Sequence, residues 1–257
     1  MSDKQFLLRN VSHAFGDVKV LDDVTLEIES GEFIAIVGPS GCGKTTLLNL
    51  LSGHFAPTSG SIERNGRPRM VYQEDSLFPW WTVDENISLG LRKLAQNGKR
   101  EGRIRELLRL IRLEGFGNHY PHQLSGGMRQ RVELARALAG DVDTLLMDEP
   151  FSALDYLERL RMRQELARIL QGRSHTVALV THDIDEAAQL ADRVVVLSER
   201  PAQIRRELRI HARRPRSGRR LHGRLGQHER RCRHRRRAAP CACALSPRRC
   251  AARPRCP

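Results

Sequence analysis

The sequence lacks any apolar run that approaches the roughly 18 residues needed to cross a bilayer. Residues 1–9 also lack the apolar stretch that a secretory signal peptide carries. Residues 1–231 contain one cysteine, Cys42, which suits a reducing compartment. These absences predict a cytoplasmic chain without a membrane span.

Acidic residues are scarce in the C-terminal segment, and this scarcity accounts for the charge of the whole chain. The 257 residues have a formal net charge of +14. Residues 201–257 hold 19 of the 44 Lys and Arg residues and two of the 30 acidic residues, so they carry +17 and residues 1–200 carry −3. All 19 of these basic residues are arginine, and five of the six cysteines lie in the same segment. The basic excess is therefore a property of residues 201–257 alone.

Residues 211–257 have the composition of a disordered tail rich in Arg and Cys, because they contain too little apolar surface to form a core. One interpretation is a basic arm attracted to RNA or to a membrane. The other, which we favour, is out-of-frame translation of GC-rich DNA, which would yield Arg, Ala, Pro, Gly and Cys. We therefore expect the folded domain to comprise residues 1–210.

A glycine-rich turn lies between an apolar strand, residues 33–37, and a leucine-rich helix that includes residues 47–51. Its spacing fits the phosphate-binding loop G-x-x-x-x-G-K-[ST], in which backbone N–H groups and a helix N-terminus bind phosphate oxygens. An ordinary glycine turn is the alternative, and the strand and helix on either side make it the weaker one. The candidate nucleotide-binding residues are Gly38, Pro39, Ser40, Gly41, Cys42, Gly43, Lys44, Thr45 and Thr46.

Within this loop, Lys44 can supply a charge to the β- and γ-phosphates, and the Thr45 hydroxyl is placed to bind Mg²⁺. A second apolar strand, residues 143–147, ends in two carboxylates. Asp148 is placed to hold the Mg²⁺ ion, and Glu149 to orient and deprotonate an attacking water. An acidic pair in an exposed turn would be structural, but delivery by a buried strand favours the catalytic interpretation.

Three further positions are ambiguous when each is taken alone. Ser125, Gly126 and Gly127 precede a good helix, residues 132–138, and form a second helix N-terminus suited to an anion. His182 follows the strand 176–180, and Gln73 follows a short strand that starts at residue 70. A structural role is common for each kind of residue, so their interpretation depends on the whole set.

The pattern of elements predicts an α/β fold with a mostly parallel core sheet, an N-terminal antiparallel β-subdomain and a helical subdomain at about residues 84–140. Residues 97–99 mark a break before a helix that Gly115 would cap. The antiparallel strands are expected at residues 7–11, 20–28 and 61–64. Later strands are expected at residues 143–147, 176–180 and 193–197, and later helices at residues 156–170 and 183–190.

Taken together and in this order, the motifs resemble those of the nucleotide-binding subunits of ABC transporters, over about residues 5–210. This family has a P-loop NTPase fold with bound ATP and Mg²⁺. The matching segments are the Walker A loop at residues 38–46, the Q-loop at Gln73, the signature at residues 124–128, the Walker B strand at residues 145–149, the D-loop at residues 152–155 and the H-loop at His182.

The resemblance implies roles that the residues alone do not. Phe15 would stack on adenine, at a position where the family often has Tyr. Ser125 and Gly127 would contact the γ-phosphate of an ATP bound by a second copy, so that a head-to-tail dimer encloses two ATP molecules. Gln73 and His182 would sense the γ-phosphate and the attacking water. The resemblance also places Gln73 at the Mg²⁺ ion and Gly126 and Asp155 at the nucleotide.

The segment from Gln73 to Asn86 is most similar to that of nitrate, sulfonate and taurine importer ATPases, in which it docks a helix of the membrane subunit. Its apolar side chains either contact such a partner or belong to the subdomain core, and the two interpretations weigh evenly for both tryptophans. These side chains are Leu77, Phe78, Trp80 and Trp81.

The resemblance implies an ATPase subunit that powers uptake of a small anion at the cytoplasmic face of the membrane. Its partners would be a second copy, membrane permease subunits and, indirectly, a solute-binding protein, without a specific nucleic acid. The alternative is a soluble ABC ATPase that acts on nucleic acid or ribosomes. Such proteins usually carry two cassettes or a long coiled-coil insert, and this chain shows one cassette and a compact insert.

Overall fold

The structure is a computed structural model that describes residues 4–66, 68–72, 76–91, 97–140, 142–152, 154–170 and 175–211. These residues belong to one compact unit, Met1–Ser217. Gln73 and the basic tail from residue 212 onward lie outside the described residues. The interpretations of the Q-loop glutamine and of the tail therefore stay predictions.

The first sheet is antiparallel, with the strand order β2-β1-β4. In β2, the buried residues Val24, Leu26 and Ile28 alternate with exposed ones, as expected of a sheet with one covered face. The predicted N-terminal antiparallel subdomain is confirmed. Its strands are β1 (Lys4–Phe15), β2 (Val18–Glu29) and β4 (Ser59–Arg64).

The second sheet has the strand order β5-β6-β7-β3-β8-β9, in which β9 alone is antiparallel to its neighbour. Every residue of β3, β6 and β7 is buried, as expected for parallel strands that are covered on both faces. The predicted mostly parallel core sheet is confirmed. Its strands are β3 (Phe33–Val37), β5 (Pro68–Val71), β6 (Thr144–Asp148), β7 (Thr176–Val180), β8 (Arg193–Leu197) and β9 (Ile204–Arg209).

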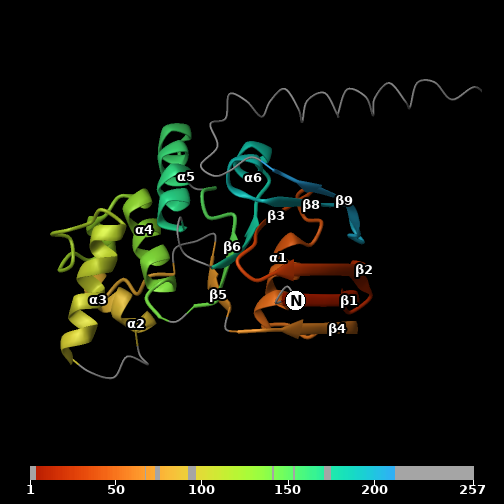
Figure 1. The fold of residues 1–257 in the computed structure, drawn as a ribbon, viewed down its shortest axis with the longest axis horizontal. Coiled ribbons are helices and arrows are strands. Elements are labelled where there is room, and N and C mark those ends of the chain that lie inside the picture. Colours follow the sequence, from red (N-terminus) through yellow and green to blue (C-terminus); the bar gives the residue numbers. More distant parts are fainter. Residues whose placement is uncertain are drawn as a thin grey trace, which may run out of the picture. The chain divides into compact units, whose positions relative to one another are not determined.

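The helices divide into two sets. Helix α1 contacts strands of both sheets, whereas α2, α3 and α4 lie together at one end of this unit, away from β1 and β2 (Figure 1). None of the described helices combines the length and apolarity that a membrane-crossing segment requires. The helices are α1 (Lys44–Ser52), α2 (Val83–Gly90), α3 (Asn97–Leu110), the 3₁₀ turn η1 (Pro121–Gln123), α4 (Gly126–Ala137), α5 (Tyr156–Leu170) and α6 (Ile184–Leu190).

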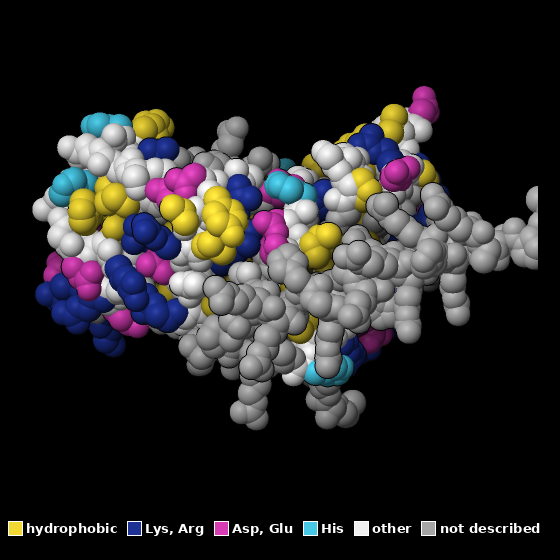
Figure 2. Space-filling view, turned by 90° about the horizontal axis from the view of Figure 1, so that it is seen from above, with side chains coloured by type: hydrophobic (Ala, Val, Ile, Leu, Met, Phe, Trp, Pro, Cys, Tyr) yellow, Lys and Arg dark blue, Asp and Glu magenta, His cyan; other side chains and the backbone are white. Residues whose placement is uncertain are grey.

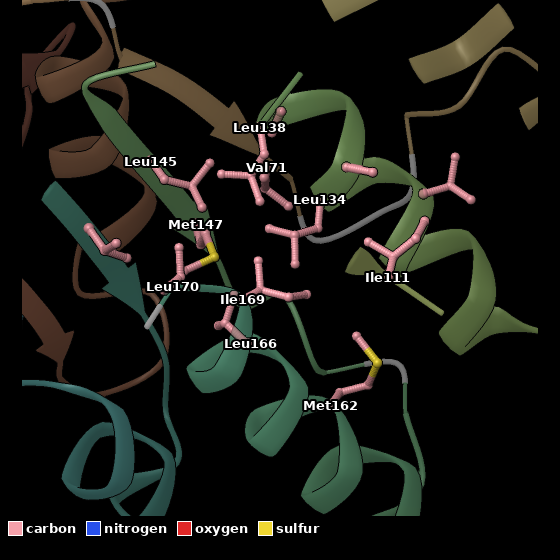
Figure 3. Packing of buried hydrophobic residues seen from close by; sticks show 14 of the residues in the cluster. Val71, Ile111, Leu134, Leu138, Leu145, Met147, Met162, Leu166, Ile169 and Leu170 are labelled. Atoms are coloured by element: carbon pink, nitrogen blue, oxygen red, sulfur yellow. The ribbon is translucent and has the colours of Figure 1, made fainter. Parts of the chain in front are cut away.

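A shared hydrophobic cluster joins the helical region to the strand that ends in Asp148. Figure 3 shows Leu166 and Ile169 of α5 gathered with Leu134 of α4 and Met147 of β6, and all four side chains are buried. Burying a side chain of this size stabilises a fold by about 1.5–3 kcal/mol. The position of the helical region is thus fixed against β6 by apolar contacts and not by the chain connection alone.

Two predictions about the helix at residues 97–110 are wrong. Helix α3 begins at Asn97, so residues 97–99 form its first turn and not a break; glycine lowers helix stability without forbidding the conformation. Its end is not capped by Gly115. Arg112 takes the left-handed conformation, with φ 56°, and the Leu113 amide donates to the Leu108 carbonyl at 2.9 Å. This is a Schellman ending in which arginine replaces the usual glycine.

Candidate active site

The phosphate loop connects the fully buried strand β3 to helix α1. At its end Gly43 has φ 116°, and a Cβ atom there would lie 2.7 Å from Val20 Cγ1, so glycine is required. Lys44 is buried, and its ammonium group donates to the carbonyls of Gly38 at 3.1 Å and Pro39 at 2.9 Å. The ammonium is thereby held at the loop that the sequence predicts to bind phosphate oxygens.

A turn that is distant in the sequence donates hydrogen bonds to the phosphate loop. Arg200, between β8 and β9, donates to the Gly41 carbonyl through Nε at 3.2 Å and also through Nη2. The turn is itself fixed to β2, because Asp22 and Val20 exchange backbone hydrogen bonds with Ala202 at 2.9 and 2.8 Å. The sequence gives no local signal for Arg200, because its partner lies 159 residues away.

Asp148 is buried at the end of β6. Burial, the largest effect, and the nearby charge of Glu149 raise the pKa of its carboxyl. A hydrogen bond from Thr45 and the charge of Lys44 lower it. The net result is a pKa above the usual value. Its Oδ1 atom has no hydrogen-bond partner among the described residues. A water or an ion bound at this position would satisfy that oxygen.

The oxygen atoms of Thr45 and Asp148 fit a magnesium ion. The described part of the chain contains no group of three or more His, Cys, Asp or Glu side chains that could hold a metal. Mg²⁺ is commonly bound by one or two protein oxygens together with substrate phosphates and water, and does not need such a group. Thr45 and Asp148 would hold the ion here, and the ion would neutralise charge on the phosphates.

Glu149 and His182 meet at the ends of two neighbouring strands, β6 and β7. The Nδ1 atom of His182 lies 3.0 Å from Glu149 Oε2. Glu149 has φ 44°, which is uncommon outside glycine, and its amide donates to the Val180 carbonyl at 2.9 Å. Backbone strain of this kind is concentrated at functional sites. The structure therefore brings together the two side chains that the sequence predicts around the attacking water.

The D-loop leads from Glu149 into α5. Ser152 donates to the Glu149 carbonyl through its amide at 3.1 Å and its hydroxyl at 3.0 Å. The Asp155 carboxylate accepts a hydrogen bond from the Glu158 amide at 2.8 Å, in the manner of a helix cap. The structure thus explains Asp155 as a cap of α5, and its contact with nucleotide stays a prediction.

The signature segment starts helix α4. Ser125 caps the helix, and its hydroxyl accepts from the Met128 amide at 3.3 Å. A Cβ atom on Gly126 would meet open space, and one on Gly127 would lie 3.9 Å from Leu154 of the D-loop. In Figure 1, α4 and α1 lie on opposite sides of β5 and β6. The contact of Ser125 and Gly127 with the nucleotide of a second copy stays a prediction.

Phe15 ends β1 and is about half exposed. Its ring packs edge-on against His13, with centroids 4.7 Å apart, and against Phe55, with centroids 5.5 Å apart. An exposed ring supported by two others provides a face on which a base can stack.

The aromatic residues after Gln73 form a surface loop. Leu77 is buried, whereas Trp80 is 68% exposed and Trp81 is partly buried against Phe78. The core interpretation is therefore wrong for Trp80. The loop is fixed by the fully buried Asn86, whose side chain accepts from the Phe78 amide at 2.8 Å and donates to three backbone carbonyls. The sequence does not reveal this role of Asn86.

The phosphate loop, the buried carboxylate of Asp148 and the Glu149–His182 pair together define a nucleoside triphosphatase of the P-loop class. The sequence profile of the family described as "ABC transporter" matches residues 21–152. The chain belongs to this family and is an ATP-binding protein that hydrolyses ATP.

Two curated relatives show the extent of the similarity. The aliphatic sulfonates import ATP-binding protein SsuB 1 of Rhodococcus jostii is 46% identical over 215 residues, which cover 81% of this chain and 84% of that protein. The taurine import ATP-binding protein TauB of Jannaschia sp. is 42% identical over 217 residues, which cover 79% and 81%.

A solved dimeric structure of a bacterial ABC transporter cassette has the same fold. Its TM-score is 0.71 at 34% identity, and the match covers 81% of this chain and all of that one. A second dimeric cassette structure, described as a post-hydrolysis state bound to ADP and Pi, has a TM-score of 0.70 at 32% identity.

Proposed function

We propose that this chain is the ATPase subunit of an importer for a small sulfonate- or nitrate-like anion. Two copies would enclose two ATP molecules on a pair of membrane subunits, at the cytoplasmic face of the membrane. The observation that carries the proposal is the similarity, over 81% of the chain, to a protein named for aliphatic sulfonate import. The dimeric cassettes of the same fold support the arrangement of two copies.

In this proposal the phosphate loop and Lys44 bind the phosphates, and Glu149 accepts a proton from the attacking water. The water oxygen forms a bond to the γ-phosphorus as the bond to the bridging oxygen of ADP breaks. His182 holds the Glu149 carboxylate and the water in place through its imidazole. Ser125 and Gly127 complete the site from the second copy, and Gln73 and the Thr45–Asp148 pair serve the Mg²⁺ ion.

The surface loop around Trp80 is the proposed contact for the permease. On the face shown in Figure 2, exposed hydrophobic side chains lie in small groups among charged ones. Trp80 belongs to a rigid loop, because Asn86 holds the backbone at Phe78 and Trp81. In this proposal an aromatic residue on this loop, which follows Gln73 in the sequence, transmits a change at the γ-phosphate to a partner.

The solute class can be tested in cells whose own copy of the gene encodes Glu149→Gln. We expect these cells to lose uptake of isotopically labelled taurine, an alkanesulfonate or nitrate, because the transporter is no longer powered. Uptake of an amino acid such as proline serves as the control. Unchanged uptake of all three anions would contradict the proposed substrate class.

Sedimentation of the chain with ribosomes, abolished by RNase, would favour the nucleic-acid alternative.

Replacing Trp80 with glutamate should uncouple transport from ATP hydrolysis. Trp80 is 68% exposed and lies outside the nucleotide site. We therefore expect the melting temperature of the isolated chain to stay within a few degrees of wild type and its ATPase rate to stay within twofold. Uptake should fall about tenfold or more. Trp80→Phe, which keeps an aromatic surface, should retain most uptake. Equal uptake by the Trp80→Glu protein and wild type would remove this loop from the permease contact.

A further inference from the structure

A charged cluster joins the D-loop to the H-loop within one chain. It consists of Arg159 and Arg163 on α5 and Asp183, which follows His182. The Asp183 carboxylate caps α6, where Oδ1 accepts from the amides of Asp185 at 2.9 Å and Glu186 at 3.2 Å. Its other oxygen, Oδ2, forms a close ion pair with Arg163 and lies 3.8 Å from Arg159 Nη1.

Arg159 is the member of the cluster that reaches both loops. While Nη1 faces Asp183, Nη2 donates to the carbonyl of Leu154 in the D-loop at 3.0 Å. The D-loop is bonded in turn to the Glu149 carbonyl through Ser152. The guanidinium group of Arg159 thus links the D-loop, which follows Glu149, to Asp183, which follows His182. This geometry suits the planar guanidinium of arginine and not the ammonium of lysine.

The backbone on both sides of His182 is fixed, although the ring itself is exposed. The Thr181 amide donates to the Ile36 carbonyl at 3.2 Å, and the Thr181 hydroxyl donates to Glu186 at 2.6 Å and accepts from the Asp183 amide at 3.0 Å. The orientation of the imidazole therefore depends on where Asp183 and Thr181 are held. Glu149, Arg159 and His182 line one small recess together with Asp183.

The charges of Asp183 and of the two arginines stabilise the contact between α5 and Asp183. Burial acts to raise the pKa of Asp183, but hydrogen bonds from backbone amides and the charge of Arg163 leave it below the usual value. Asp183 is therefore an anion between two arginines. Burial raises the pKa of the neighbouring Glu186 to about 7, against the hydrogen bond from Thr181 and the charge of Arg163.

We propose that Arg159 is a positioning residue for ATP hydrolysis, which holds the D-loop and the H-loop in the one arrangement where Glu149 and His182 meet. It acts through Asp183 and the Leu154 carbonyl and does not touch the nucleotide. This inference rests on the proposed roles of Glu149 and His182. It assigns to Arg159 an effect on kcat and not on ATP binding.

A double-mutant cycle tests the inference on the full chain. Arg159→Met removes both contacts, whereas Asp183→Asn removes the charge but keeps an oxygen that can cap α6. We expect kcat to fall about tenfold in each variant and the double variant to lose clearly less than the product of the two effects, because the two residues share one of their contacts. KM for ATP should stay within twofold, since the phosphate loop is untouched. Arg161→Met, an exposed arginine on the same helix, should leave kcat unchanged.

Three other outcomes of the same experiment would overturn the inference. Effects that multiply in the double variant would show that Arg159 does not act through Asp183, and a KM that rises as kcat falls would show that Arg159 affects ATP binding. An unchanged kcat in Arg159→Met would also overturn the inference. If Arg159→Met does not fold, Arg159→Lys takes its place in the cycle, because it keeps a positive charge but cannot reach both partners. Failure of the proposed role of Glu149 is distinct, because it would appear as normal turnover in Glu149→Gln.

Discussion

Replacing Glu149 with glutamine should reduce the kcat of ATP hydrolysis by about 10²–10⁴-fold and leave ATP binding intact, as expected when a general base is removed. The substitution keeps the size and shape of the side chain but removes the carboxylate that accepts the proton. The side chain lies 3.0 Å from the His182 ring and belongs to a residue whose backbone is held at φ 44°, so the change is confined to the chemistry of one group. Single-turnover kinetics and equilibrium binding of labelled ATP measure the two effects separately.

The same variant should accumulate an ATP-bound dimer. Two copies can close on two ATP molecules, but without hydrolysis they do not reopen. Size-exclusion chromatography with ATP should show the dimer for Glu149→Gln, and adding Ser125→Arg should abolish it, because that position serves the other copy. Near-normal turnover in Glu149→Gln would exclude the base role, and a dimer that survives Ser125→Arg would argue against the shared site.

Short-range features of the site could be predicted from the sequence because the chemistry and the chain order coincide. The apolar strand, the glycine spacing and the leucine-rich helix around Lys44 are neighbours in the chain, so their pattern determines a strand, a loop and a helix. Asp148 and Glu149 were predicted for the same reason, since a buried strand ends at them.

Long-range contacts could not be predicted, because their partners share no sequence pattern. Arg200 reaches the phosphate loop from a turn 159 residues away, and Arg159 meets Asp183 from a different helix. Asn86 looks like an ordinary polar helical residue until its amide is seen to hold the aromatic loop. Arg112 ends α3 in a conformation that glycine usually supplies, so the glycine preference of helix ends wrongly indicates Gly115.

Replacing Lys44 with alanine should weaken ATP binding itself, by about 10- to 100-fold, the amount expected when a hydrogen bond to a charged group is lost from a buried site. The Lys44 ammonium is buried and already oriented by the carbonyls of Gly38 and Pro39, so it meets the phosphates without further ordering. Isothermal titration calorimetry with ATP on the Glu149→Gln background measures this affinity without turnover. Lys4→Ala is a matched control, because it removes an equal charge from a surface pair with Glu27 and should leave the affinity unchanged. Equal ATP affinity for the Lys44→Ala protein and its parent would contradict the placement of Lys44 at the phosphates.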